Sequence, residues 1–399
     1  MKVLISNLLR NNKVVYRNYV RMRYGFDCLR RKLFFHKERV INGQLAFLRE
    51  NYNKDTKKII LFMMPAIDGV GGGIMAKCHL YKETISLRDV HGCEVLAVRS
   101  LWHNFNWDFC QYTGFNNQVY VFYFESIMRY FNNLESITLH IGEDVQKFVE
   151  YYNICMSKSE YKWWTDIAMR HINVLNMHIK LMSEPDYVKS LENIANKVTQ
   201  TTAHLKYANL EMRKKYGIPL HHLSARFEDV YEVYSFTEKK KVVMVSDDLG
   251  YENGADISTI DKIKRKILDN IKKYTDFEIV VVKDMKYEEY KKLAKEAMFS
   301  ITFGEGLDGY FIEPVWSGGV SFAVYNEEFF TKDFEGLTTV YNSYNHMLEN
   351  ICRDIKYFQN EKTYYDYNMR IRSILDKQYS IRSYRENIRD FYLGKYLYP

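Results

Sequence analysis

One stretch of the chain, residues 301–326 (ITFGEGLDGYFIEPVWSGGVSFAVYN), restricts the possible folds most strongly. It connects two apolar runs, residues 298–303 and 320–325, through a short segment bounded by glycines. Two strand-like runs joined by a segment long enough for about two helical turns are typical of a βαβ unit in a parallel sheet. Polar groups that follow such a strand face the crevice in which α/β sheets bind ligands. The sequence therefore predicts an α/β protein with a ligand site after the first run.

Two glutamates in this stretch are candidate site residues. Glu305 follows the first run after one residue and lies between two glycines, and Glu313 follows about two helical turns later. This separation allows both carboxylates to return to one side of a helix. The alternative is that both are ordinary helix carboxylates in contact with solvent. The position of Glu305 among glycines at a strand end favours a site.

The spacing of Glu305, Glu313 and Gly318, together with the two flanking strands, resembles the retaining GT-B glycosyltransferases of the glycogen-synthase-like group. The resemblance implies an α/β architecture of two Rossmann-like domains facing a central cleft, with a C-terminal helix that crosses back to the first domain. It also implies that Glu305 is a catalytic residue near the transferred sugar. Glu313 would hold the ribose hydroxyls of a nucleotide-sugar donor, and Gly306 would lie against the donor.

The length of the chain predicts more than one domain, because 399 residues exceed a single ordinary core. With the resemblance, we expect four segments. They are a basic helical arm over residues 1–55, an acceptor-side Rossmann-like domain over 56–235, a donor-binding Rossmann-like domain over 236–375, and a helix over 376–399 that packs on the first of these domains.

The first domain begins with a strand, a glycine-rich loop and a helix. Residues 59–64 are an apolar run, and the sequence GVGGGI follows at 69–74. The backbone N–H groups of such a loop and of the next helix bind anions. The dinucleotide fingerprint is excluded because Ile74 replaces its third glycine, and no P-loop lysine follows. The loop resembles the GT-B glycine loop, which implies that Gly72 and Gly73 contact the donor; a turn needed only for packing is the alternative.

Two histidines of the first domain end apolar runs. His140 ends the run ITLH, and His178 ends the run INVLNMH. Enzymes of the group often place a histidine near the donor sugar, so either imidazole is a candidate catalytic group. A structural role is the alternative for each, and the sequence leaves open which one is functional.

The loop after the first strand of the second domain departs from the family pattern. Members usually carry an arginine and a lysine there, which hold the donor diphosphate. This loop instead offers Ser246, Asp247 and Asp248, and its carboxylates would repel phosphates. Lys283, after the next strand, and Arg226, in the interdomain linker, are the candidate replacement cations. An ordinary surface position is the alternative for both.

The positive charge is concentrated at the amino-terminal end. Residues 1–58 contain 15 Lys and Arg against four Asp and Glu, whereas the net charge of the whole chain is +7. Apolar side chains at loosely helical spacing over residues 1–50 predict a basic amphipathic helix, which can lie on an anionic membrane surface. Packing of this helix on the first domain is an equal alternative. Since no nucleic-acid reader motif is present, we expect no nucleic-acid partner.

Cysteine usage and hydropathy predict a cytoplasmic protein, and the basic amphipathic helix, if it is not packed on the first domain, would attach it peripherally to the inner face of the membrane. The six cysteines form no C-x-x-C pair, which indicates reduced thiols and no zinc module. No apolar run approaches the ~18 residues of a membrane span, and the N-terminus lacks a signal-peptide core. No two aspartates are two positions apart. The D-x-D metal motif of the other large glycosyltransferase fold is therefore missing, and we expect no metal and no cofactor.

The resemblance, together with the missing D-x-D motif, implies a metal-independent hexosyltransferase. It would move a sugar from a nucleotide-diphosphate donor to a hydroxyl of a glycan or lipid-linked acceptor, and the resemblance implies retention of the anomeric configuration. Two alternatives stay open. One is a phosphorylase or epimerase of the same fold, and the other is a catalytically inactive GT-B-like scaffold in a membrane-associated glycan assembly complex, which the acidic loop at residues 246–248 favours.

Overall fold

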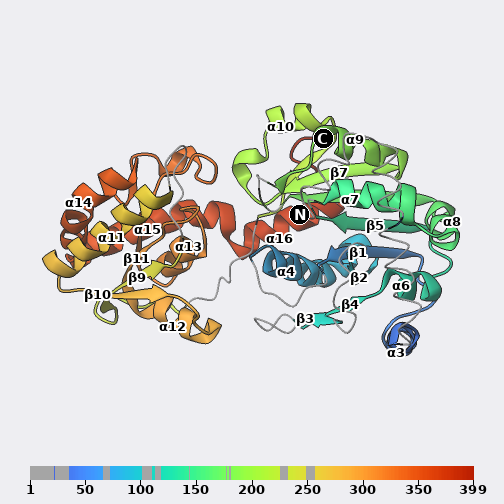
Figure 1. Ribbon diagram of the computed structural model, residues 1–399, viewed down its shortest axis with the longest axis horizontal. Helices are drawn as coiled ribbons and strands as arrows, with labels where there is room; N and C mark the ends of the chain where they lie inside the picture. Colours follow the sequence, from blue (N-terminus) through green and yellow to red (C-terminus); the bar gives the residue numbers. More distant parts are fainter. Residues whose placement is uncertain are drawn as a thin grey trace. The chain divides into compact units, whose positions relative to one another are not determined.

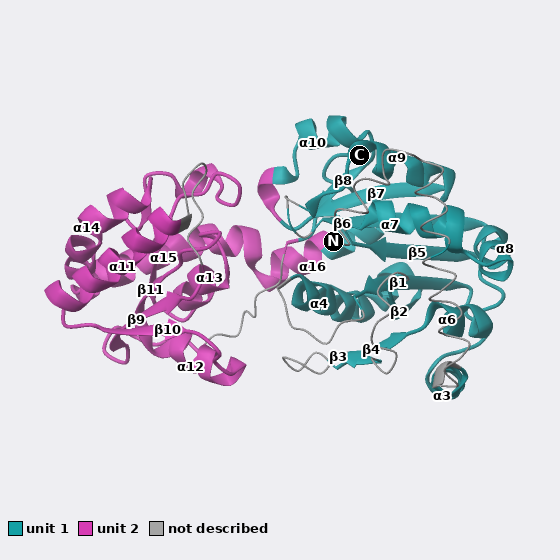
Figure 2. Cartoon of the chain, viewed as in Figure 1, with its two compact units in different colours: residues 1–203, 207–223, 388–399 teal, residues 204–206, 224–387 magenta. Residues whose placement is uncertain are grey.

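The chain forms two compact units, which Figure 2 distinguishes by colour. The computed structural model describes residues 22, 36–65, 72–100, 110–112, 118–142, 144–176, 178, 181–224, 232–248 and 257–399. Unit 1 comprises Met1–Ala203, Tyr207–Leu223 and Ile388–Pro399, and unit 2 comprises His204–Lys206 and Ser224–Asn387. Within the described residues, no helix is both long and apolar enough to cross a membrane.

The sheet of unit 1 has the strand order β3-β4-β2-β1-β5-β6-β7-β8 and is parallel except for the pair β3–β4. Its strands are β1 (Lys58–Met64), β2 (Glu94–Arg99), β3 (Gln111–Tyr112), β4 (Val119–Phe122), β5 (Ser136–Ile141), β6 (Met169–Asn176), β7 (Lys197–Thr202) and β8 (Leu220–His222). The order reverses between β1 and β5. The carboxyl ends of these two strands are therefore the topological switch point, where open α/β sheets bind ligands.

Helices cover both faces of this sheet (Figure 1). One face packs against α4 (Gly72–Ser86), α5 (Arg88–His91) and the end of α16 (Ile381–Tyr392). The other face carries the main apolar core and packs against α3 (His36–Asn51), α6 (Phe124–Tyr130), α7 (Val145–Glu150), α8 (Lys158–Asp166), α9 (Pro185–Ser190) and α10 (Leu210–Tyr216). A π-helical turn at Tyr151–Cys155 and 3-10 turns at Leu191–Asn193 and Leu205–Tyr207 complete the helical segments that the structure describes here. Because both faces are covered, strands β1 and β2 are almost entirely apolar.

Helix α3 belongs to the core of unit 1. Ile41, Leu45 and Leu48 lie on its inner side and are buried among core residues of the sheet and of α6. This spacing of apolar residues is the one by which a helix packs on a globular core. For α3, the structure therefore supports packing on the first domain. The remaining part of the predicted basic helix, residues 1–21 and 23–35, lies outside the described residues.

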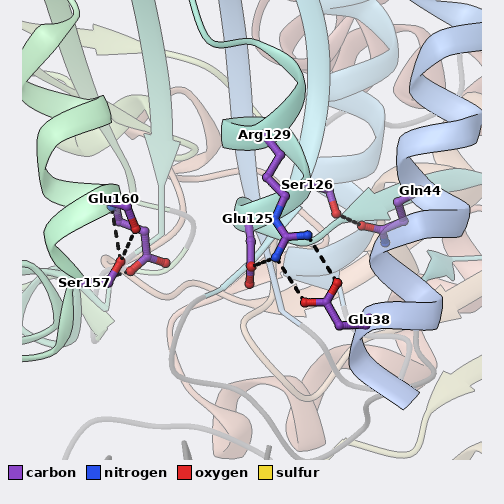
Figure 3. A network of polar contacts seen from close by, with 8 residues as sticks. Glu38, Gln44, Glu125, Ser126, Arg129, Ser157 and Glu160 are labelled. Carbon is purple, nitrogen blue, oxygen red and sulfur yellow. Dashed lines mark hydrogen bonds and ion pairs between the residues drawn. The ribbon is translucent and has the colours of Figure 1, made fainter. Parts of the chain in front are cut away.

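Polar contacts also hold α3 in place (Figure 3). The buried amide oxygen of Gln44 accepts hydrogen bonds from the Ser126 hydroxyl at 2.7 Å and from the Tyr123 N–H at 2.9 Å. On the exposed side, both oxygens of Glu38 pair with the guanidinium of Arg129, at 3.1 and 3.2 Å. Exposed ion pairs contribute only about 0–1 kcal/mol. The buried bonds of Gln44 therefore contribute more than the ion pair to the position of the helix.

A buried chain of hydrogen bonds connects the sheet of unit 1 to α16. His171 Nε2 lies 2.8 Å from the Thr199 hydroxyl, which donates to Asn173 Oδ1 at 2.8 Å. The Asn173 amide nitrogen lies 3.1 Å from Nδ1 of His140, and His140 Nε2 lies 2.9 Å from the Tyr392 hydroxyl. Because the amide can only donate, His140 must accept at Nδ1 and carry its proton on Nε2. The chain of bonds therefore requires a neutral imidazole at His140.

We expect unit 1 to lose stability as the pH falls below about 6.5. Burial lowers the pKa of His171 to about 3, and burial lowers the pKa of His140 well below its ordinary value. Between about pH 6.5 and 3, the unfolded chain binds protons that the folded chain does not. Each histidine then removes up to about 1.4 kcal/mol of unfolding free energy per pH unit. Denaturant titrations at several pH values between 8 and 5 measure this slope.

Two variants test whether the buried imidazole causes the slope. In His171→Gln, the amide can still donate to Thr199, but it does not titrate, so the pH dependence should become shallower. His346→Gln changes an exposed histidine on α14 of unit 2 and should leave the wild-type slope unchanged. Equal slopes for wild type and His171→Gln would show that the buried imidazole does not govern acid stability.

The sheet of unit 2 is parallel throughout and has the order β10-β9-β11-β12-β13. Its strands are β9 (Lys240–Ser246), β10 (Glu278–Val282), β11 (Ala297–Ile301), β12 (Val320–Val324) and β13 (Val340–Tyr341). One face packs against α11 (Ile257–Tyr274) and α14 (Tyr344–Tyr357), and the other against α12 (Tyr287–Glu296) and its neighbour α13 (Gly309–Trp316). A 3-10 turn at Lys332–Phe334 and α15 (Glu361–Tyr379) complete the unit. The strand order reverses between β9 and β11, which is the switch point of this sheet.

The carboxyl-terminal segment returns to unit 1. Helix α16 begins in unit 2 and ends in unit 1, as the resemblance implied. Beyond α16, Leu220 of β8 and Tyr398 exchange backbone hydrogen bonds of 2.9 and 3.0 Å. The last residues of the chain thereby pair with the edge of the first sheet.

Candidate functional site

The predicted βαβ unit lies at the centre of unit 2. Strand β11, helix α13 and strand β12 follow one another, and every residue of the two strands is buried. The loop 302–308 joins β11 to α13 and places Glu305 after the carboxyl end of the strand. The glutamate is partly exposed, so it lies where a ligand at the sheet edge can reach it.

The loop 302–308 meets the loop that follows β9. The N–H of Phe303 donates to the Ser246 hydroxyl at 3.1 Å, and the carbonyl of Phe303 accepts from the Tyr344 hydroxyl at 2.6 Å. A Cβ at Gly304 would lie 3.2 Å from the side chain of Asp248. The two loops thus touch at the switch point between β9 and β11, so the topology and the contacts indicate the same place for a ligand.

Gly306 allows the tight turn next to Glu305. Its φ of +86° lies in the left-handed region, which glycine adopts without steric strain. A Cβ at this position would also lie 2.6 Å from the ring of Phe330 and 2.9 Å from the carbonyl oxygen of Val324. Both the backbone conformation and the close packing therefore require glycine here.

Asp308 closes the loop 302–308 at its base and was not singled out in the sequence. Its Oδ2 accepts from the Thr302 hydroxyl at 2.7 Å, and its Oδ1 accepts from the Phe311 N–H at 3.1 Å, which makes it the N-cap of α13. Burial raises the pKa of Asp308 to about 7, and the nearby Asp248 and Glu305 add to the increase. The sequence contained a signal for this residue, because aspartate is a preferred N-cap three positions before a helical N–H.

Lys264 brings a positive charge to the switch point and was also missed. From α11, its ammonium donates to the carbonyl oxygens of Ser246, at 3.0 Å, and of Asp248, at 2.9 Å. It lies 4.8 Å from the ring centroid of Phe303. Burial lowers the pKa of Lys264, while the neighbouring aspartates oppose this change. Nothing in the sequence separates it from the other lysines of α11, because its position depends on contacts with distant loops.

The two cations proposed from the sequence have different outcomes. Lys283 follows β10 at the same edge of the sheet and forms an exposed ion pair with Asp247, at 3.1 Å. Its place after the strand is as expected, and a role toward phosphate stays a prediction. Arg226 lies outside the described residues.

Glu313 is a buried carboxylate on α13. It is only 8% exposed, and its Oε2 lies 3.5 Å from the ammonium of Lys291 on α12. The interpretation of Glu313 as a solvated helix carboxylate therefore does not hold. Aromatic side chains adjoin the same helices, since Tyr290 and Tyr310 pack edge to face at 5.6 Å and Tyr290 donates to the Gly309 carbonyl at 3.3 Å.

The expectation that His140 presents its imidazole to a crevice is wrong in this structure. The side chain has no exposed surface, stacks on Phe62 at 4.4 Å and uses both ring nitrogens within the protein. Its partners make it a packing histidine, as the alternative proposed. His178 follows the end of β6 by two residues and is partly exposed, and its catalytic role stays a prediction.

In unit 1, α4 begins at Gly72, and Gly73 lies exposed in its first turn. Residues 66–71, with the other glycines of the predicted loop, lie outside the described residues. Lys77 of α4 is buried, and a Cβ added at Gly142 would lie 2.6 Å from its ammonium nitrogen. Gly142 follows β5, so the Lys77 charge lies at the switch point of unit 1, where the sequence analysis had not placed a cation.

Across the described parts of both units, no three or more His, Cys, Asp or Glu side chains converge in a way that could hold a metal ion.

Comparison with known proteins shows the fold. No protein-family model matches the sequence, and no curated protein matches it significantly. Among solved structures, the chain is similar to HepE from Anabaena in complex with UDP-glucose, with 11% identity, a TM-score of 0.52, and coverage of 84% of this chain and 99% of that chain. A second structure of HepE, with UDP and glucose, gives 10% identity, a TM-score of 0.50 and the same coverage. At such identities the similarity shows the fold alone, and the function has to be inferred from the residues of the site. The predicted architecture of two Rossmann-like sheets with a returning C-terminal helix is confirmed, and the chain has the GT-B fold of glycosyltransferases.

Proposed function

We propose that this protein is a retaining, metal-independent glycosyltransferase that moves a hexose from a nucleotide-diphosphate donor to a hydroxyl of a glycan or lipid-linked acceptor. One observation carries the proposal. At the switch point of unit 2, a glycine turn holds Glu305 after β11, and the next helix carries the buried Glu313. The same fold binds UDP-glucose in HepE, which supports a nucleotide-sugar donor.

The two glutamates have different roles in this proposal. Glu305 binds hydroxyls of the transferred sugar and places negative charge near the oxocarbenium-like transition state. Glu313, as a carboxylate, offers only hydrogen-bond acceptors, which suit the two adjacent hydroxyls of a ribose. Its ion pair with Lys291 fixes its position on α13.

The leaving diphosphate gathers negative charge and needs positive potential. Lys264 and Lys283 supply it at the carboxyl edge of the sheet, although each already contacts the loop 246–248. The pair between Lys283 and Asp247 is largely exposed and is worth about 0–1 kcal/mol. Lys283 can therefore leave Asp247 and pair with a donor phosphate at little cost in free energy.

Replacing Glu313 by alanine should weaken donor binding by about 10- to 100-fold, because a hydrogen bond to a charged group contributes about 1.5–3 kcal/mol. Turnover at saturating donor should change much less. Calorimetric titration with UDP-glucose measures the affinity, and Glu349→Ala, at an exposed position on α14, is the matched control. An unchanged affinity in Glu313→Ala would show that Glu313 does not bind the ribose.

A scaffold without catalysis is the second candidate, and the acidic loop 246–248 favours it. Asp247 and Asp248 adjoin the place where a donor diphosphate would bind, and like charges repel. Donor hydrolysis and binding assays over a panel of nucleotide sugars separate the two candidates. Turnover of any donor supports the transferase. No turnover together with no nucleotide binding supports the scaffold.

We further propose that residues 1–35 supply the contact with an anionic membrane surface, since α3 is already used in the core of unit 1. The basic composition of the amino-terminal end supports this part of the proposal.

A further inference from the structure

The carboxyl group of Asp308 joins the two ends of the loop that carries Glu305. Thr302 lies directly after β11, and Asp308 lies directly before α13. The hydrogen bond between their side chains, 2.7 Å long, joins the two ends of the loop, and the bond from the Phe311 N–H, at 3.1 Å, fixes Asp308 to the helix. Glu305 and Gly306 lie between the two ends.

The surroundings of this carboxyl group are mainly acidic. Glu305 faces it from the same loop and Asp248 from the loop after β9. Tyr310 faces it from α13, and Lys264 on α11 holds the backbone of Asp248. Among the described side chains, those that act on Asp308 are therefore mainly carboxyl groups, and the Lys264 ammonium lies behind Asp248.

We propose that Asp308 is a positioning residue of the donor site, which holds Glu305 in place and tunes donor affinity through its own protonation. The inference rests on the proposed function, because it assigns a role in donor binding. Asp308 acts through the loop and through its charge, since both of its oxygens are bonded to Thr302 and Phe311.

The direction of the effect follows from the charge of the donor. Because the pKa of Asp308 is about 7, the group is mostly neutral at pH 6 and mostly ionised at pH 8. Ionisation adds a negative charge near the bound diphosphate. A unit charge about 10 Å away at an effective dielectric constant of about 20 corresponds to roughly a tenfold change in affinity. The affinity of the wild-type protein for UDP-glucose should therefore fall by about tenfold between pH 6 and pH 8.

A second effect does not require a ligand. The folded protein holds the proton of Asp308 more tightly than the unfolded chain does, so the stabilisation is complete below the unfolded pKa near 3.8. It is lost as the pH rises through the folded pKa of about 7. The thermal midpoint of unit 2 should therefore decrease as the pH rises over this range, and this effect can be measured without any catalytic activity.

The test compares three variants at pH 6, 7 and 8, with affinity measured by calorimetric titration with UDP-glucose and kcat by steady-state release of nucleoside diphosphate. Asp308→Asn keeps both bonds, because its oxygen accepts from Phe311 and its nitrogen donates to the Thr302 hydroxyl. It should bind at every pH with the affinity of wild type at pH 6. Asp308→Ala loses both bonds and should lose at least about tenfold in kcat at all three pH values. Asp333→Asn, at an exposed carboxylate of unit 2, should keep the wild-type profile.

Each outcome decides a different claim. If wild type and Asp308→Asn show the same pH dependence of affinity, the inference about charge is overturned and the proposed function stands. If Asp308→Ala turns over donor as wild type does, the positioning role is overturned. If the wild-type protein binds neither UDP-glucose nor any other nucleotide sugar of the panel at any pH, the proposed function fails, and the inference fails with it.

Discussion

Replacing Glu305 by glutamine is expected to reduce the turnover of sugar transfer by at least about 100-fold and to leave the fold intact. The amide has the same shape as the carboxylate, and the side chain is partly exposed, so packing is preserved. The variant removes the negative charge that the proposal places beside the oxocarbenium-like transition state. Removal of one such preorganised group typically reduces kcat by a factor of about 100 to 1,000. Steady-state release of nucleoside diphosphate measures the effect.

The control for this variant is Glu349→Gln, which changes an exposed carboxylate on α14 of the same unit. It should keep wild-type turnover. Both variants should remain folded, because glutamine keeps the size and shape of the glutamate side chain. Wild-type kinetics in Glu305→Gln would count decisively against the assignment of this residue to the reaction.

Replacing Gly306 by alanine is expected to lower the unfolding free energy of unit 2 by about 2–5 kcal/mol. A left-handed backbone costs a residue with a Cβ about 1–2 kcal/mol. The added methyl group must also displace the Phe330 ring, 2.6 Å away, and the Val324 carbonyl, 2.9 Å away, and overpacking typically costs about 1–3 kcal/mol. Denaturant titration measures the loss. Turnover should fall as well, because Glu305 adjoins the displaced turn.

Gly336 provides a matched control for the steric part of this effect. It also has a positive φ, of +72°, but a Cβ at this position meets no atom within 4 Å. Gly336→Ala should therefore show only the backbone cost, about 1–2 kcal/mol, and normal turnover. If the two alanine variants lose the same stability, the packing around Gly306 has no special importance.

Local patterns in the sequence predicted the elements on which the site is built. The β11–α13–β12 unit was predictable because apolar runs and glycines alternate there within about 30 residues, and such signals depend on neighbours in the chain. The long helix α11 and the strands on either side of it follow from the same kind of periodicity. The GT-B architecture followed from the resemblance of the glutamate spacing and is confirmed by the fold.

Contacts between distant residues decide the parts that the sequence could not predict. His140 has its partners in Asn173, 33 residues away, and Tyr392, 252 residues away. A run of apolar residues that ends in histidine has the same sequence pattern whether the ring faces a ligand or packs against a helix that covers the sheet. Lys264 likewise becomes a site residue only because two loops far along the chain meet beside its ammonium.

The amino-terminal helix illustrates an ambiguity of amphipathic patterns. The apolar positions of α3 suit a membrane surface and a protein core equally well. Only the burial of Ile41 and Leu48 and the hydrogen bonds of Gln44 assign this helix to the core. Asp308 shows the opposite case, because its N-cap position was visible in the sequence. Its raised pKa depends mainly on burial and also on Asp248, which the fold brings close.

A crystal structure of the protein soaked with UDP-glucose tests the central claim most directly. We expect a nucleotide at the carboxyl ends of β9 and β11, with the sugar hydroxyls within hydrogen-bonding distance of Glu305 and the ribose hydroxyls within hydrogen-bonding distance of Glu313. A nucleotide bound elsewhere, or an empty switch point at a concentration that saturates binding in solution, would contradict it.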